Sequence, residues 1–260
     1  MALRPEKKLL PLVLSAKASN WSERRHDQEE LGREFQKAKD KALQRDGYRC
    51  RFCGFYSRTD MEVSHLDSDH GNNDISNLAA SCFFCHSLDH IGHSGSLKES
   101  VLIWLPEISQ AQLNHIVRTC VVARFTCCDQ PITASAKPGQ KVSPIAEGPS
   151  ILAAADAVMA ALSDRAGEAE RLVGTSSAKE MGNILQDMAI QRPDLYDQRG
   201  ERLYGIRLFN LGVKIANGKN VISDHVKQWI SPQDSGAYAT GLKADTWKNI
   251  MTSVLGISQF

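Results

Sequence analysis

Two pairs of cysteines, each with the spacing C-x2-C, constrain the fold of this chain more than any other feature. Cys50 and Cys53 form the first pair, and Cys82 and Cys85 form the second after 28 intervening residues. A structural Zn²⁺ ion binds four such thiolates at the corners of a tetrahedron. The pattern therefore predicts one structural zinc ion that holds the two pairs together and contributes directly to folding.

The residues around each pair indicate how the backbone presents the sulfurs. Gly54 directly follows the first pair and permits a tight turn at the tip of a hairpin. We expect a short strand over residues 61–66, a polar loop from Asp67 to Asp74, and a helix that opens near Ser76 and carries the second pair. Residues three apart on a helix share one face. The predicted ion would thus join a hairpin to a helix.

The three other cysteines are expected to take no part in the metal site. Cys120 lies on the apolar face of a helix that Ser109 can cap, which is typical of a core position. Cys127 and Cys128 are adjacent, so they cannot easily occupy two corners of one tetrahedron.

The chain contains no run of eighteen apolar residues, so no membrane-spanning helix is predicted. The segment Lys7–Leu14 has the charge and apolar order of a signal peptide, but its apolar part is too short and contains Pro11. We expect a buried first strand there instead. These features favour a cytoplasmic protein, in which thiols stay reduced and paired cysteines bind metal.

A change of composition divides the chain. Residues 131–150 contain four prolines and few large apolar residues, which is typical of a linker. The predicted fold class is α+β, with a zinc-binding domain over residues 1–130 and a small all-helical domain over residues 151–260. In the first we expect an amphipathic helix from about Glu23 to Gln44 that ends at Gly47, and a strand over 101–104. In the second, apolar faces predict helices over 151–162, 181–188, 203–215 and 245–255.

The overall charge does not indicate a nucleic-acid partner. The chain has 31 Lys and Arg against 30 Asp and Glu. Basic residues are frequent among the first sixty, but acidic residues are interleaved with them. A solvated helix face is therefore preferred to a DNA-binding surface.

Three residues around the cysteine pairs resemble the HNH, or ββα-metal, endonuclease motif: His65, Asn77 and His86. The resemblance implies that His65 would be the general base, that Asn77 would orient it, and that His86 would bind a second divalent ion. Nucleases of this type usually have an acidic or histidine ligand before the base, where this chain has Ser64. We therefore expect a degenerate site with no catalytic residues. Residues that could in principle replace the missing ligand are Asp67, Asp69, His70 and His90.

A longer stretch resembles a narrower family, the IcmJ/DotN proteins of type IVB secretion systems and related conjugative plasmids. The resemblance rests on residues 44–55, 72–73, 75–78, 82–85 and 102–114, the last of which belongs to no nuclease motif. It implies an HNH-like zinc fold without nuclease activity and with no cofactor besides zinc. It also implies a cytoplasmic adaptor in the coupling complex of the secretion apparatus.

The partners that this resemblance implies are the C-terminal tail of the coupling ATPase and other coupling-complex subunits, with no direct DNA binding expected. We expect the docking surface to include aromatic positions beside the cysteines, of which two could equally belong to the core: Phe52, Phe55, Phe83 and Phe84. The alternative function is that of a metal-dependent HNH endonuclease acting on DNA, with His65, Asn77 and His86 as its site.

Overall fold

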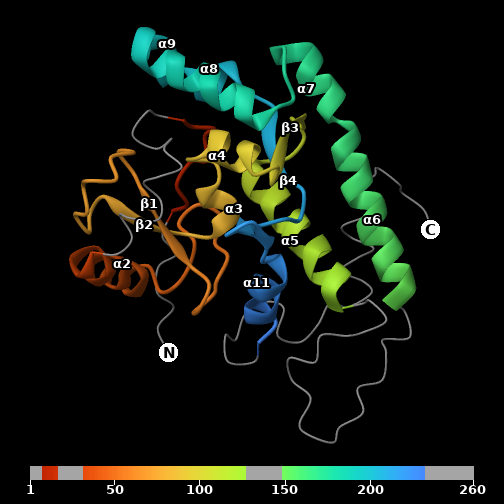
Figure 1. Cartoon of the computed structure of the whole chain (residues 1–260), viewed down its shortest axis with the longest axis horizontal. Helices are drawn as coiled ribbons and strands as arrows, with labels where there is room; N and C mark the ends of the chain where they lie inside the picture. The colour runs from red at the N-terminus through yellow and green to blue at the C-terminus, as the bar shows by residue number, and fades with distance from the viewer. Residues whose placement is uncertain (1–7, 17–31, 127–147, 232–260) are drawn as a thin grey trace, which may run out of the picture.

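The computed structural model describes residues 8–16, 32–126 and 148–231, and it combines helices with small antiparallel sheets (Figure 1). This agrees with the predicted α+β class. The helices are α2 (Arg33–Arg45), α3 (Phe83–His86), α4 (Ile91–Ser96), α5 (Gln110–Thr126), α6 (Gly148–Asp164), α7 (Ala166–Val173), α8 (Ala178–Gln191), α9 (Pro193–Asp197), α10 (Arg199–Arg202) and α11 (Ile222–Trp229). The strands are β1 (Glu62–His65), β2 (Leu78–Ser81), β3 (Ser100–Trp104), β4 (Ile206–Asn210), β5 (Ile215–Ala216) and β6 (Lys219–Asn220).

The first sheet carries the cysteine region. Strand β1 pairs with β2 in antiparallel register, from Glu62 opposite Ser81 to His65 opposite Leu78. Helix α2 packs against this sheet and α3 follows β2 (Figure 1). The expected helix from Ser76 is wrong, because a turn at 74–77 returns the chain alongside β1 as a fully buried strand. The helix begins only at Phe83.

The second sheet joins two distant parts of the sequence. Strand β3 pairs with β4, from Ser100 opposite Asn210 to Trp104 opposite Ile206. The predicted all-helical C-terminal region is therefore wrong, since it contains the strands β4, β5 and β6. Gly205 and Gly212 have φ values of +83° and +75° and break any helix at the two ends of β4.

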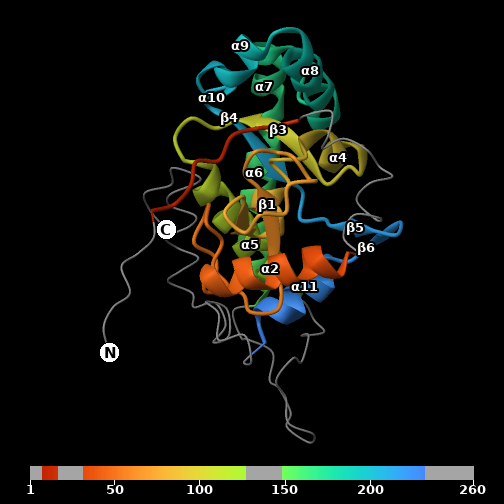
Figure 2. The ribbon, with the colours of Figure 1, turned by 90° about the vertical axis from the view of Figure 1, so that its left-hand side faces the viewer.

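Helices cover this second sheet on several sides. Helices α4, α7 and α8 pack against β3, and α5 packs against β4 (Figure 2). Helices α5 and α6 run side by side along one flank of the molecule (Figure 1). Two buried apolar clusters form the core, and each contains residues from both sides of the expected linker.

Other expectations have mixed outcomes. The end of α2 and the positive φ of Gly47 agree with the predicted helix end. A continuous helix from about Glu23 is wrong, because Gly32 is extended and α2 begins at Arg33; residues 17–31 lie outside the described part. The described residues 8–16 form no strand, although Leu14 and Ala16 are buried. The expected buried first strand is therefore wrong.

The expected helix at 245–255 and most of the linker at 131–150 lie outside the described residues, and the domain boundaries stay a prediction. None of the described helices is long and apolar enough to cross a membrane.

Candidate metal centre

The structure brings the four predicted cysteines together. Their sulfur atoms all lie within 4.8 Å of one another, and all four residues are buried. Cys50 and Cys53 lie in a hairpin turn, where the Cys50 amide donates to the Phe55 carbonyl and Gly54 has a φ of +76°. Cys82 caps α3 and Cys85 lies within it. Four close, buried sulfurs are a ligand set that could hold one metal ion.

Helix α5 contacts this cluster through three polar side chains that the sequence alone did not reveal. Asn114 Nδ2 donates to the Cys85 sulfur at 3.3 Å, and Arg118 Nη2 donates to the Cys82 sulfur at 3.0 Å. His115 Nε2 lies 2.7 Å from the Cys53 carbonyl oxygen. Such partners orient metal ligands and stabilise negative charge on sulfur. In the sequence, the only indication of these contacts is that a helix with an apolar face also carries these polar residues.

Without a cation, the four sulfurs do not all lose their protons easily. Burial, together with the nearby sulfurs of Cys50 and Cys53, raises the pKa of Cys82 and of Cys85 well above its ordinary value. Hydrogen bonds from the other three sulfurs lower the pKa of Cys53. The cluster alone therefore opposes the loss of all four protons, which a bound cation would offset. Cys120 is buried in the apolar core, where burial raises the pKa of its thiol to about 12, and it is not part of the cluster.

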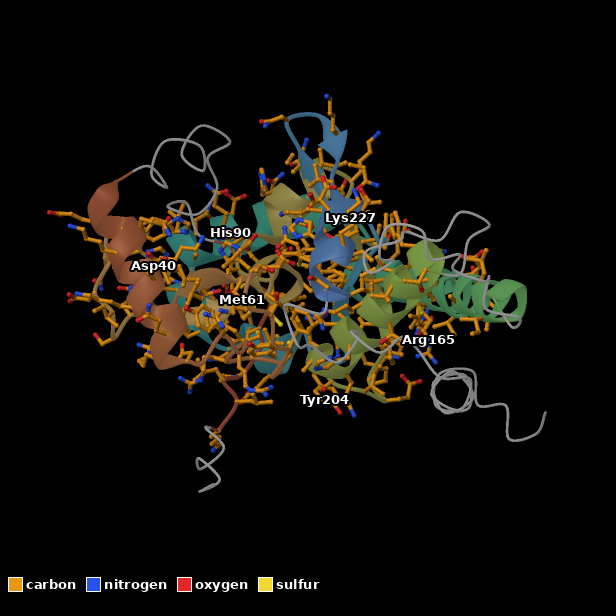
Figure 3. All side chains as sticks on the ribbon, turned by 90° about the horizontal axis from the view of Figure 1, so that it is seen from below. Asp40, Met61, His90, Arg165, Tyr204 and Lys227 are labelled. Carbon is orange, nitrogen blue, oxygen red and sulfur yellow. The ribbon has the colours of Figure 1, made fainter. Side chains whose placement is uncertain are left out.

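A row of histidine rings lies beside the cysteines. The rings of His65 and His70 are stacked, with their centroids 4.8 Å apart. The centroid of the His90 ring lies 5.2 Å from that of His70 and 4.7 Å from that of His86. His86 Nδ1 pairs with the carboxylate of Glu62 on β1. Seen from below, His90 lies between Asp40 of α2 and Lys227 of α11 (Figure 3).

The predicted nuclease residues lie near one another, and the structure shows hydrogen-bond partners for them. Asn77 donates to Asp67 at 2.8 Å and to the Asn72 carbonyl at 2.9 Å, which holds the loop before β2. His65 Nε2 lies 3.1 Å from the Asn73 side-chain oxygen. The Ser64 side chain is buried.

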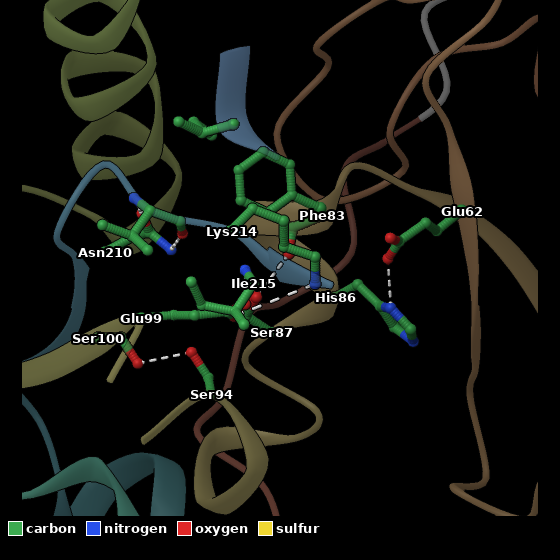
Figure 4. A network of polar contacts seen from close by, with 12 residues as sticks. Glu62, Phe83, His86, Ser87, Ser94, Glu99, Ser100, Asn210, Lys214 and Ile215 are labelled. Carbon is green, nitrogen blue, oxygen red and sulfur yellow. Dashed lines mark hydrogen bonds and ion pairs between the residues drawn. The ribbon is translucent and has the colours of Figure 1, made fainter. Parts of the chain in front are cut away.

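The C-terminal part adds charged groups next to this region, which local sequence patterns could not predict. Lys214 lies 4.0 Å from the buried Glu99 and over the ring of Phe83 (Figure 4). The Ile215 amide donates to Glu99 at 2.6 Å. Figure 4 shows the Glu62–His86 pair on the other side of the same network. Two segments more than a hundred residues apart thus meet beside α3.

The four aromatic residues that were considered for docking are all buried, so they belong to the core: Phe52, Phe55, Phe83 and Phe84. Helix α11 helps to cover them, because Trp229 contacts three of these rings at centroid distances of 5.9 to 6.0 Å. His225 and Trp229 of α11 are both hydrogen-bonded to Asp60.

Comparison with known proteins gives a relative for part of the chain. No family model matches it. It is 35% identical over 120 residues to the Type 4 apparatus protein DotN of Legionella pneumophila. The match covers 44% of this chain and 55% of that protein, so the chain spans about half the length of the curated relative. This similarity confirms the predicted resemblance to the IcmJ/DotN family.

Proposed function

We propose that this protein is a zinc-stabilised adaptor in the coupling complex of a type IVB secretion or conjugative transfer system. The similarity to the Type 4 apparatus protein DotN carries the proposal, because it covers 120 residues at 35% identity. The adaptor would act in the cytoplasm and reach the inner-membrane apparatus through its partners. Its partners would be the C-terminal tail of the coupling ATPase and other coupling-complex subunits, and it would help to recruit substrates.

The cysteine cluster fits zinc in its donor set and its spacing. The sulfurs of Cys53 and Cys82 are 3.7 Å apart. A tetrahedral site with zinc–sulfur distances of about 2.3 Å has sulfur–sulfur edges of about 3.8 Å. With all four positions taken by protein ligands, the ion would be structural and would activate no water. Asn114 and Arg118 would hold the sulfurs as thiolates.

The order of elements around the cluster is compatible with an HNH-like ββα framework. Strands β1 and β2 form an antiparallel pair and α3 follows directly, with His86 at its end. We infer that this framework is kept for its shape. Ser64 supports this inference, because a buried serine replaces the metal ligand that the nuclease chemistry requires.

A binding experiment tests the adaptor role. The full, zinc-loaded chain should be retained by an immobilised C-terminal region of the coupling ATPase of the same secretion system. We expect one-to-one binding that survives moderate salt. The proposal would be overturned if the folded, zinc-loaded protein bound neither this region nor any other coupling subunit.

Paired cysteine variants test the metal site separately. Cys82→Ser should lower both the zinc content and the soluble yield, because it removes a ligand on which the fold depends. Cys120→Ser is the matched control, since Cys120 is equally buried but lies outside the cluster. Metal content is measured by mass spectrometry on the purified proteins. Zinc loss in the control variant, or full zinc retention in Cys82→Ser, would show that the ligands are wrongly assigned.

The second candidate function is that of an HNH-type DNA endonuclease. The observation that favours it is the continuous row of rings from His65 to His86. Nicking of plasmid DNA with Mg²⁺ or Mn²⁺, lost in His65→Ala, would establish this activity. Intact plasmid across several divalent metals would rule it out.

A further inference from the structure

The side chain of Gln110, the first residue of α5, takes the place of a third strand at the outer edge of β4. The Leu208 N–H donates to Gln110 Oε1 at 2.9 Å, and Gln110 Nε2 donates to the Leu208 carbonyl oxygen, also at 2.9 Å. On its other edge β4 pairs with β3, where Leu102 lies opposite Leu208. Two bonds to the backbone groups of one residue are what a paired strand would supply there. Gln110 therefore fixes the start of α5 to β4.

The backbone of Leu208 also fixes which end of the Gln110 amide is the donor. The amide oxygen faces the Leu208 N–H, so the amide nitrogen faces the Leu208 carbonyl and Asn114. Gln110 Nε2 donates to Asn114 Oδ1 at 2.9 Å. The two residues are four apart on α5, where side chains are neighbours on the helix surface. Because Asn114 accepts this bond through its oxygen, its nitrogen points the other way.

The nitrogen of Asn114 reaches the cysteine cluster. Nδ2 donates to the Cys85 sulfur at 3.3 Å. A thiolate can only accept hydrogen bonds, so a donor at this position suits a deprotonated, metal-bound sulfur. Gln110, Asn114, Leu208 and Cys85 are all buried, and hydrogen bonds in such a low-dielectric interior strengthen one another. These four residues form an amide relay from the backbone of β4 to one of the four sulfurs.

We propose that Gln110 is a positioning residue for the metal centre. It holds Asn114 in the orientation that donates to Cys85, and through this relay β4 controls how tightly the cluster retains its metal. The inference rests on the proposed binding of zinc by the four cysteines. It is independent of the nuclease reading, because Gln110 and Asn114 lie in the stretch 102–114, which belongs to no nuclease motif.

A cobalt-substituted form of the full chain tests the proposal. Co²⁺ can replace Zn²⁺ at a four-thiolate site, and its sulfur-to-cobalt charge-transfer band reports the electron density on the coordinating sulfurs. A hydrogen bond to a sulfur stabilises that density and moves the band to higher energy. The spectrum is recorded for each variant, and zinc affinity is measured by competition with a chromophoric chelator.

Two single variants and their combination separate a role through Asn114 from a purely structural one. Asn114→Ala removes the donor, so it should move the band to lower energy and weaken zinc binding by about 10- to 100-fold. Gln110→Met leaves the Asn114 amide free to turn, so it should shift the band in the same direction. The double variant should match Asn114→Ala in both spectrum and zinc affinity, because the two side chains act on one bond.

Gln112→Met is the matched control on the same helix. The Gln112 side chain accepts a hydrogen bond from the Ser109 N–H at the start of α5 and is outside the relay. This change should weaken the helix end and leave the band in place. If Gln110→Met does not fold, Gln110→Glu replaces it, since its carboxylate still accepts from the Leu208 N–H and offers no amide donor to Asn114.

The outcomes distinguish the relay from the zinc site itself. Additive effects of the two changes on zinc affinity, or a wild-type band in the folded Gln110 variant, would overturn the positioning role. A wild-type chain that gives no four-thiolate cobalt spectrum would instead refute the zinc site on which the inference rests.

Discussion

Arg118 shows how a single residue can link the helical core to the cysteine cluster. Its side chain is fully buried, and its guanidinium lies 3.8 Å from the centroid of the Phe55 ring. Arginine stays protonated in proteins, so its burial is costly unless a negative group lies nearby. The Cys82 sulfur, 3.0 Å from Nη2, provides such a group when it is a thiolate. The charge of Arg118 therefore favours a metal-bound, deprotonated cluster.

The first prediction concerns this contact. Arg118→Met should lower the free energy of unfolding of the zinc-loaded protein by about 2–4 kcal/mol, because the thiolate loses a charged donor. It should also speed the release of zinc to a chelator. Urea unfolding measures the free energy of unfolding, and a chromophoric chelator measures the rate of zinc release. Arg124→Met is the control on the same helix, since Arg124 forms a half-exposed pair with Asp156 worth at most about 1 kcal/mol. Equal effects of the two variants would contradict the role of Arg118.

The second prediction concerns the buried Glu99. Burial raises the pKa of its carboxyl group, so the folded state holds this proton to higher pH than the unfolded state does. The stability that Glu99 contributes is therefore present at acidic pH and is lost as pH rises through the folded-state pKa. Glu99→Gln should gain stability relative to the wild type as pH rises from about 4.5. Urea unfolding at a series of pH values measures this.

An opposite trend is expected for an exposed glutamate. Despite some desolvation, the hydrogen bond from Arg165 lowers the pKa of Glu107, so its small contribution is lost as pH falls. Glu107→Gln should therefore show no gain at higher pH. A parallel pH dependence for both variants would contradict the assignment of the effect to Glu99.

At the scale of elements, the contact between α4 and α8 depends on the absence of side chains. A Cβ atom added at Gly182 of α8 would lie 2.4 Å from the Cα of Gly92 in α4. Because the obstructing atoms are backbone, the helices would have to move apart. Each of these glycines lowers helix propensity locally, and the close packing offsets that cost.

The third prediction follows from this contact. Gly182→Ala should lower the free energy of unfolding by about 1–3 kcal/mol, since overpacking outweighs the gain in helix propensity. Gly167→Ala in α7 is the matched control, because no atom lies within 4 Å of the added Cβ. We expect the control to be neutral or slightly stabilising. Urea unfolding of both variants measures the difference, and destabilisation of both alike would refute the packing explanation.

At the scale of the whole molecule, the C-terminal part stabilises the cysteine region. Asp60, seven residues after Cys53, accepts hydrogen bonds from His225 and Trp229 of α11. Trp229 is buried against the aromatic rings around the cysteines. Strands β3 and β4 form a second connection between the two parts. Removal of metal from the cysteines should therefore loosen α11 as well.

The fourth prediction tests this connection. Asp60→Ala leaves the buried Trp229 Nε1–H without its acceptor, so we expect a loss of about 1–3 kcal/mol and faster zinc release. Asp224→Ala is the control within α11, since Asp224 forms an exposed pair with Lys227. Thermal unfolding and chelator kinetics measure both variants. Normal zinc release by Asp60→Ala would show that α11 does not support the metal centre.

The sequence by itself determined the cysteine cluster, the hairpin turn at Gly54, the strand β1 and the end of α2 before Gly47. These features follow from short spacings and local backbone preferences, which act within a few residues. The same is true of α5, where Ser109 and Gln112 form the reciprocal cap that the spacing allows.

Only the tertiary structure decided the course of residues 78–81 and 206–210. Apolar side chains in short runs fit a helix or a strand equally well, and the choice depends on a pairing partner. For β4 that partner is β3, about a hundred residues earlier, so no local pattern reveals it. The same long-range pairing placed Lys214 beside Glu99, and α11 beside the cysteines. Contacts between distant segments, and not the propensity of either one, set these parts of the fold.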